Sequence, residues 1–146
     1  MLNIYLADLT HNYMKVANET MPIGIAYIKT FLEKNLESHV QCKLFRYPDK
    51  LLDAIDLNPP DVLMVSNYIW NESLSLFVIK YAKSVNPKLL SVMGGPNFAL
   101  EASKQEKWLR NNPTLDIFII YEGEKPALNL MNKLIEVDSS VNEVKK

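Results

Sequence analysis

Aromatic and amide side chains are concentrated in one short segment of the sequence, Ser66–Ser73. This segment follows the apolar run Val62–Val65, and two aromatic rings with two amides beside a strand end suit a flat ligand with polar edges. A purely structural explanation covers the same residues: Asn71 or Ser73 caps the next helix, and Trp70 packs on a neighbouring loop. The two explanations are compatible, and we expect this loop to contact a ligand.

Two glycine-containing segments follow later apolar runs. In Gly94-Gly95-Pro96-Asn97, glycines at a strand end let a ligand, or another stretch of backbone, approach more closely than a side chain allows. A tight turn with Asn97 as a helix cap explains the same residues without a ligand. In Glu122-Gly123-Glu124, Gly123 turns the chain and Glu124 favours the positive end of a helix.

Several chemistries lack the residues they need. The single cysteine, Cys42, excludes an internal disulfide and a cysteine-built zinc or iron–sulfur site, and its strand position favours the core. The phosphate-binding G-x-x-x-x-G-K-[ST], the dinucleotide-binding G-x-G-x-x-G and the G-x-S-x-G nucleophile elbow are absent. A phospho-receiver domain fits poorly, because the third apolar run ends in Ser66 instead of Asp. We therefore expect a binding module without catalytic residues or metal ligands.

Two hydrophobic periods alternate along the chain and define the elements that position these segments. Short apolar runs predict strands near residues 4–7, 40–45, 62–65, 89–93 and 117–120. Helical spacing follows each run, over about 22–36, 49–57, 74–85, 98–110 and a last helix with Leu128, Met131, Leu134 and Ile135. Five strands alternating with five helices predict a doubly wound, flavodoxin-like α/β/α domain with a parallel sheet in the order 2-1-3-4-5.

Ligands of such sheets bind at the carboxyl ends of the strands, beside the switch point between strands one and three. Four loops lie there: Leu9–Met21, Asn67–Glu72, Gly94–Asn97 and Tyr121–Glu124. The first is longer than the roughly two to six residues that such a connection needs, which favours a functional role. Its polar residues are His11, Asn12, Tyr13, Lys15, Asn18 and Glu19. We expect His11 to be a solvated loop residue and not a metal ligand.

Four segments in this order resemble a known family: Met21–Ile28, Pro60–Ser66, Gly94–Asn97 and Glu122–Glu124. Together they resemble the N-terminal cobalamin-binding domain of radical S-adenosylmethionine enzymes, over almost the whole chain. The resemblance implies that cobalamin's nucleotide tail enters between the loops of Ser66, Gly94-Gly95 and Glu122, with Asn67–Trp70 toward the corrin. The cofactor-binding residues it implies are Ser66, Asn67, Tyr68, Trp70, Gly94, Gly95, Pro96, Asn97, Glu122, Gly123 and Glu124.

Two departures from family patterns refine this expectation. The wider cobalamin-binding fold often carries D-x-H-x-x-G, whose His ligates cobalt, but here the six residues Glu19–Gly24 place Met21 at the His position. The pattern is similar to that of radical enzymes that hold cobalamin without a histidine ligand. The family's catalytic domain binds a 4Fe-4S cluster and S-adenosylmethionine through C-x-x-x-C-x-x-C, which a chain with one cysteine lacks. That domain would be a C-terminal part or a separate subunit.

The expected function is therefore cobalamin binding for a radical S-adenosylmethionine enzyme, of the methyltransferase type by resemblance. Two other functions stay open: a cofactor-free interaction domain of such an enzyme, and a flavin-type binder with Tyr68 and Trp70 flanking the ring. We expect the domain to span residues 1–136, and residues 137–146 to form a polar tail or the start of an interdomain linker.

Composition narrows the remaining classes. The chain has 146 residues, which fits one domain, and a formal net charge of −1, which argues against a dedicated nucleic-acid binder. No apolar run approaches the roughly 20 residues that a membrane span needs. Met1–Ile4 has no basic segment of the kind that begins a secretory signal. We therefore expect a cytoplasmic protein with no membrane or nucleic-acid partner.

Overall fold

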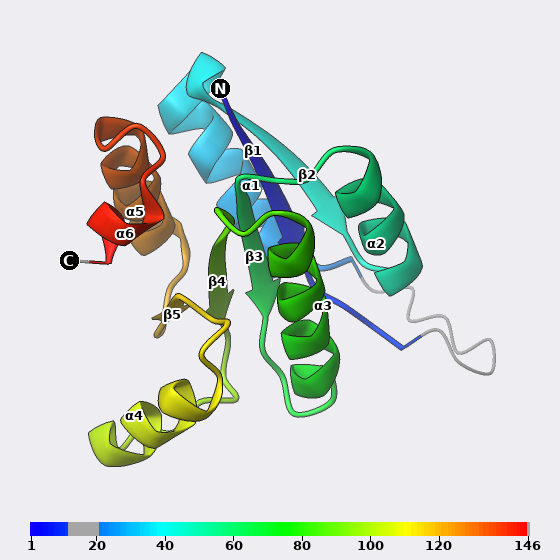
Figure 1. The fold of residues 1–146 in the computed structure, drawn as a ribbon, viewed down its shortest axis with the longest axis vertical. Coiled ribbons are helices and arrows are strands. Elements are labelled where there is room, and N and C mark those ends of the chain that lie inside the picture. The colour runs from blue at the N-terminus through cyan, green and yellow to red at the C-terminus, as the bar shows by residue number, and fades with distance from the viewer. Residues whose placement is uncertain (12–20, 146) are drawn as a thin grey trace.

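The computed structural model describes residues 1–11 and 21–145. It contains one five-stranded parallel sheet in the order β2-β1-β3-β4-β5, which confirms the predicted topology (Figure 1). The strands are β1 (Leu2–Ala7), β2 (Val40–Phe45), β3 (Val62–Ser66), β4 (Leu90–Gly94) and β5 (Ile117–Ile119).

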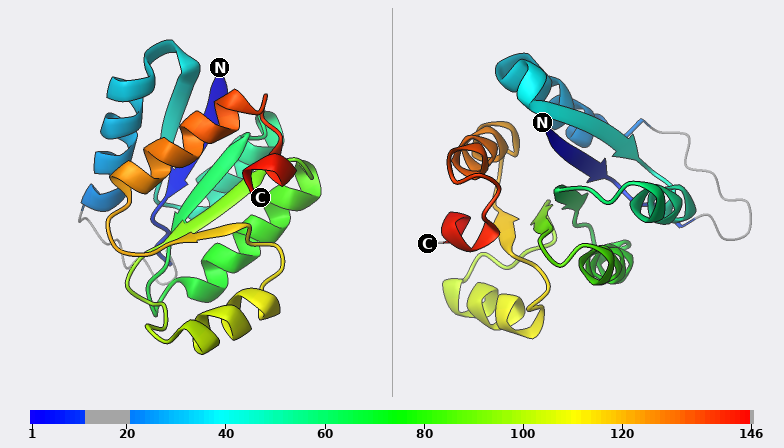
Figure 2. Two further views of the ribbon diagram at one scale, coloured as in Figure 1. Left: turned by 90° about the vertical axis from the view of Figure 1, so that its left-hand side faces the viewer. Right: turned by 45° about the horizontal axis from the view of Figure 1, so that its top comes forward.

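Helices cover both faces of the sheet (Figure 2). On one face lie α1 (Ile23–Leu36) and α5 (Glu124–Glu136), and on the other α2 (Pro48–Leu57) and α3 (Glu72–Val85). A short 3-10 turn, η2 (Glu37–His39), joins α1 to β2. Helix α4 (Ala102–Asn111) contains no buried residue and stands apart from the other helices in Figure 1.

The central strands hold the core together because they are buried on both faces, as parallel strands between two helical layers must be. In β1, Ile4 and Leu6 pack toward α1 and α5, while Tyr5 and Ala7 pack toward α2 and α3. Cys42 belongs to the first cluster, as predicted, and burial raises the pKa of its thiol to about 11.

Several helix boundaries differ from the prediction. Helix α2 begins at Pro48, so Asp49 lies in its first turn and is not its cap. Helix α4 begins only at Ala102, so Asn97 does not cap it. The reason in both cases is that capping residues are also turn residues, and their type alone does not tell which role they take.

Two side chains expected on buried helix faces are exposed. Leu57, at the end of α2, has 86% of its surface exposed, and Phe77 of α3 has 57% exposed. In α3 the buried stripe instead contains Ser75, Val78, Ile79 and Ala82. A small serine faces the sheet because its hydroxyl donates to the Ser66 carbonyl, a role that hydrophobic periodicity does not detect.

The C-terminal segment is more ordered than the expected polar tail. Residues Val141–Val144 form helix α6, and Val144 is buried in the core cluster of α1 and α5. Lys145 forms an ion pair with Asp116, which directly precedes β5. The expectation that this segment lacks regular structure is wrong; a linker at this point stays a prediction.

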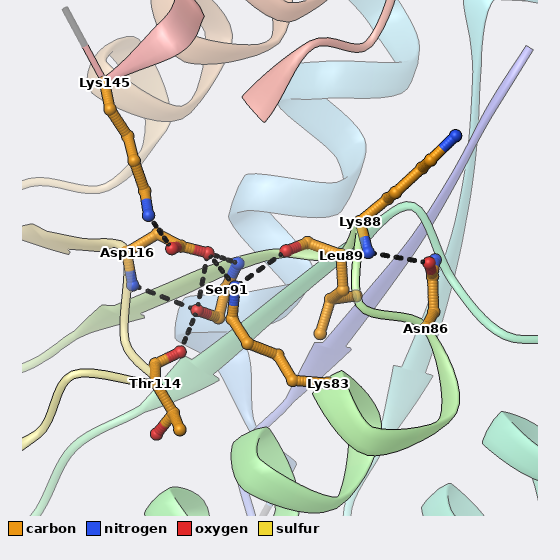
Figure 3. A network of polar contacts seen from close by, with 8 residues as sticks. All are labelled: Lys83, Asn86, Lys88, Leu89, Ser91, Thr114, Asp116 and Lys145. Carbon is orange, nitrogen blue, oxygen red and sulfur yellow. Dashed lines mark hydrogen bonds and ion pairs between the residues drawn. The ribbon is translucent and has the colours of Figure 1, made fainter. Parts of the chain in front are cut away.

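Asp116 is the centre of a polar cluster at the amino ends of β4 and β5, which Figure 3 shows. Its side chain is 1% exposed, and Lys83 Nζ lies 2.5 Å from Oδ2. The Ser91 N–H donates to the same oxygen at 2.9 Å, and Ser91 Oγ lies 2.8 Å from the Thr114 carbonyl. Burial by itself raises the pKa of Asp116, but hydrogen bonds from Lys145, Lys83 and Ser91 outweigh it and lower the pKa below its ordinary value.

Candidate functional site

A cavity of about 310 Å³ opens at the carboxyl ends of the strands, between the sheet and helices α1 and α5. This is the edge where the sequence predicted a ligand. Strand residues, both flanking helices and the loops after β3, β4 and β5 contribute to its wall. The lining residues are Leu6, Gly24, Ile25, Ile28, Met64, Val65, Ser66, Tyr68, Val92, Met93, Gly94, Gly95, Ile119, Tyr121, Glu122, Gly123, Glu124 and Ala127.

Strand register explains the floor of the cavity. Leu6, Met64 and Val92 are register partners on adjacent strands, and all three belong to the core cluster that faces α1 and α5. Two residues further along, Ser66 is the partner of Gly94 on the same face. The small side chain of Ser66 and the missing one at Gly94 leave space where larger residues would fill the gap between sheet and helices.

A buried polar network lies beside the cavity and connects the loops after β1 and β3. Ser66 Oγ donates to Asp8 Oδ1 at 2.7 Å, and the fully buried Asn71 amide donates to the Leu9 carbonyl at 3.1 Å. The Asn71 side-chain oxygen accepts the Tyr68 N–H. Asn71 therefore occupies the position before α3, as predicted, but uses its side chain to hold two loops together instead of capping the helix.

The two glycines after β4 have different surroundings. Gly95 has φ +131°, and a Cβ placed there would lie 2.5 Å from the Asn67 carbonyl oxygen. Of the two partners that the sequence allowed, a ligand or another backbone, Gly95 meets the backbone. Asn67 donates to the Asn97 carbonyl at 2.6 Å, and Asn97 donates to Glu72 at 2.7 Å, so these amides clamp the loop after β4 to the start of α3.

The loop after β5 closes the opposite wall. Gly123 precedes α5, and a Cβ there would lie 2.7 Å from Ile28 Cδ1, so only glycine lets α5 start this close to α1. Tyr121 has φ +68° and is 84% exposed at the mouth of the cavity. A positive φ at a bulky residue is rare and concentrates at ligand sites. Glu122 and Glu124 line the same wall.

The structure brings seven of the eleven predicted binding residues to the cavity: Ser66, Tyr68, Gly94, Gly95, Glu122, Gly123 and Glu124. Asn67 and Asn97 lie behind the wall, and Pro96 and Trp70 lie outside it. Trp70 stacks on Tyr68 with ring centroids 4.6 Å apart, and the His11 Nε2 lies 3.0 Å from the Trp70 carbonyl. Of the other first-loop residues named above, Asn12, Tyr13, Lys15, Asn18 and Glu19 lie outside the described residues.

The contributions of the helices were missing from the predicted site. Ile25 and Ile28 of α1 and Ala127 of α5 line the cavity from above the sheet. A signal existed, because Ile25 and Ile28 belong to the predicted apolar face of the first helix. Apolar periodicity indicates burial, however, and does not distinguish a filled core from a ligand cavity.

The family model for the B12 binding domain matches residues 12–131. The chain belongs to the B12-binding domain family. Because this match covers most of the chain, the resemblance in the loop segments is confirmed at the level of cobalamin binding.

A methyltransferase is among the relatives of this B12-binding domain. The 2-(S-pantetheinyl)-carbapenam-3-carboxylate methyltransferase of Streptantibioticus cattleyicolor is 29% identical over 116 residues, which cover 76% of this chain and 16% of the relative. The B12-binding domain thus spans about a sixth of the length of this curated relative.

Solved structures with the same fold come from other functional classes. The receiver domain of Francisella response regulator 1452 has a TM-score of 0.59 at 12% identity and covers 94% of this chain and 99% of its own. The pilus assembly protein CpaE from Caulobacter crescentus has a TM-score of 0.56 at 14% identity, covering 88% and 95%. At these identities the likeness shows the fold alone, and β3 of the B12-binding domain ends in Ser66, without the Asp of a receiver.

The residues around the cavity fit the nucleotide tail of cobalamin. The volume is at the lower end of the roughly 300–1,000 Å³ of small-molecule sites, and a Cβ at Gly24 would have no atom within 4 Å, so space remains beside α1. Within the described ranges, no three His, Cys, Asp or Glu side chains form a metal cluster, and none of the helices there is long and apolar enough to cross a membrane. This B12-binding domain therefore offers an organic cavity.

Proposed function

We propose that this chain is the cobalamin-binding domain of a radical S-adenosylmethionine methyltransferase, whose iron–sulfur catalytic domain lies outside the chain. The observation that carries the proposal is the cavity between the strand ends and helices α1 and α5, in a chain of the B12-binding family with a methyltransferase relative. When bound, cobalamin supplies a cobalt that carries a methyl group from S-adenosylmethionine to a substrate. The chain itself binds and orients the cofactor.

The nucleotide tail would be held by both the walls and the helix ends. The apolar floor of Leu6, Met64 and Val92 accommodates the base. Helices α1 and α5 both begin at the mouth, at Ile23 and Glu124, and the amide N–H groups of a helix N-terminus attract a phosphodiester. Gly24 and Gly123 keep these helix ends free of side chains.

The cobalt would have no histidine from this part of the chain. Met21, at the position of the family histidine, is 74% exposed. His11 contacts the Trp70 carbonyl, and His39 lies beside the Leu36 carbonyl at the end of α1, away from the cavity. We therefore expect bound cobalamin without a histidine ligand.

The first experiment is a titration of the purified protein with hydroxocobalamin, followed by visible spectroscopy and by retention through gel filtration. Stoichiometric retention with a spectrum that lacks histidine ligation is expected. Cobinamide, which has the corrin but no nucleotide tail, is the matched ligand control and should bind more weakly. Absence of binding at high micromolar cobalamin, or equal binding of cobinamide, contradicts the tail's placement in the cavity.

Gly24 is the best position for a blocking substitution, because a side chain there meets no atom of the fold within 4 Å. Gly24→Phe is expected to weaken cobalamin binding by at least about tenfold, or ~1.4 kcal/mol, without lowering Tm. Gly24→Ala is the control and should bind cobalamin normally, with a stability equal to or slightly above that of the wild type. Unchanged affinity of the Phe variant argues against this site.

Gly95 is a less informative position, although bulky residues there should also weaken binding. Its positive φ and its contact with Asn67 mean that any substitution distorts the loop itself. The radical S-adenosylmethionine part of the proposal has a separate test in the sequence of the catalytic domain or subunit that works with this chain. That polypeptide should contain C-x-x-x-C-x-x-C, and a partner without it would overturn this part.

A further inference from the structure

The deep part of the cavity contains only apolar side chains. Leu6, Met64 and Val92 form the floor and are 0%, 5% and 2% exposed. Ile25 and Ala127 cover them from α1 and α5 and are 6% and 0% exposed. The titratable lining residues Tyr68, Tyr121, Glu122 and Glu124 come from the loops and the start of α5, at the mouth.

Polar groups next to this deep part already have partners. Ser66 Oγ donates to Asp8 and lies 3.4 Å from the Asn71 amide, and the Ser66 carbonyl accepts the Ser75 hydroxyl. The Asn67 amide is bound to the Asn97 carbonyl. Among the described residues, the one buried side-chain N or O atom without a partner is Asn3 Oδ1, near the opposite end of β1. The interior therefore offers no free side-chain donor or acceptor.

From this chemistry we propose that the cavity selects cobamides by the base of the nucleotide tail, accepting benzimidazole-type and phenol-type bases and discriminating against adenine. The inference rests on the proposed cobalamin function and names the class of cofactor that the same site takes. Leu6, Met64, Val92, Ile25 and Ala127 are its specificity-determining residues.

The physical reason is the desolvation of polar groups. A base detached from cobalt buries one unpaired ring nitrogen as dimethylbenzimidazole, and none as a cresol. Adenine adds two further ring nitrogens and an exocyclic amine, each of which loses its water without finding a partner on these walls. Apolar pockets reject such polar additions only moderately, so we expect a preference of about 10- to 100-fold.

The test compares dissociation constants of four corrinoids for the whole chain: cobalamin, the cresolyl cobamide, the adeninyl cobamide and cobinamide. Equilibrium dialysis with optical detection gives all four on one scale. The cresolyl cobamide should bind as tightly as cobalamin or more tightly, and the adeninyl cobamide at least about tenfold more weakly. Equal binding of the adeninyl cobamide and cobalamin overturns the inference but leaves the proposed function intact. Failure of all four to bind overturns both.

A pair of valine variants separates a local effect from general destabilisation. Val92→Thr places a hydroxyl in the floor at nearly unchanged volume and should narrow the ratio between the adeninyl cobamide and cobalamin. Val62→Thr is the control, since Val62 is a buried valine of the same core cluster, two residues before Met64 in β3, and does not line the cavity. Tm of both variants is measured alongside. A ratio that stays at the wild-type value in Val92→Thr contradicts the assignment of the floor.

Discussion

At the carboxyl ends of the strands, Leu6, Met64 and Val92 leave an apolar cavity under α1 and α5. At the amino ends of β4 and β5, Ser91 and Asp116 fill the structure with hydrogen bonds and ion pairs to Lys83 and Lys145. The first region keeps its polar groups at the mouth or engaged behind the wall. The second buries a carboxylate and surrounds it completely.

This difference separates a binding surface from a structural one. An apolar cavity contributes affinity when a ligand removes its surface from water, and the empty fold tolerates it without unpaired polar groups. A buried carboxylate contributes only while every partner is in place, because an unpaired charge is costly. We therefore expect substitutions at the cavity to change affinity, and substitutions at the Asp116 cluster to change stability.

The largest effect is expected for Asp116→Ala. This variant leaves Lys83 and Lys145 facing each other without the carboxylate and leaves the Ser91 hydroxyl short of a partner. The free energy of unfolding should fall by about 3 kcal/mol, as measured by urea denaturation. Below the transition, the dissociation constant for cobalamin should stay at the wild-type value, and a parallel loss of affinity would break the separation between the two ends.

Acid should affect the two ends differently, because the deep cavity has no titratable group. The pKa of Asp116 in the folded protein is below its ordinary value of about 3.9. The unfolded chain therefore takes up the proton first as the pH falls, so the stabilisation is complete above pH 4 to 5 and is lost through the lower folded pKa. Unfolding curves from pH 7 to pH 2 should show a smaller acid loss for Asp116→Asn than for the wild type. Identical pH profiles would show that the cluster contributes no such linkage.

The smallest effect is expected for a pair of serines at opposite ends of adjacent strands, Ser91 in β4 and Ser66 in β3. Ser91→Ala removes contacts to Thr114 and Asp116, and we expect it to cost about 2 kcal/mol of stability. Ser66→Ala removes one hydrogen bond to Asp8, at a cost of about 1 kcal/mol. Because the Ser66 hydroxyl is already engaged, cobalamin affinity should change little. A large affinity loss in Ser66→Ala would mean that this hydroxyl turns to the ligand.

The amino-acid sequence determined the element types, their order and the edge that binds the ligand. Runs such as Val62–Val65 identify buried parallel strands without knowledge of their neighbours, and the helical spacing of Ile25 and Ile28 identifies an apolar helix face. These signals are local, since each depends on the period of one segment. The loops that contain Ser66, Gly94 and Glu122 follow from them.

Only the tertiary structure decided what each loop residue contacts. Gly95 allows the backbone of Asn67 to approach, Asn71 joins two loops, and Lys145 pairs with Asp116 in a segment whose sequence lacks periodicity. Partners this far apart in the chain meet through strand register and helix packing, which no single segment encodes. For the same reason Ile25 and Ala127 became cavity walls and not filled core: two helices begin at glycines, and the space between their ends and the strands stays open.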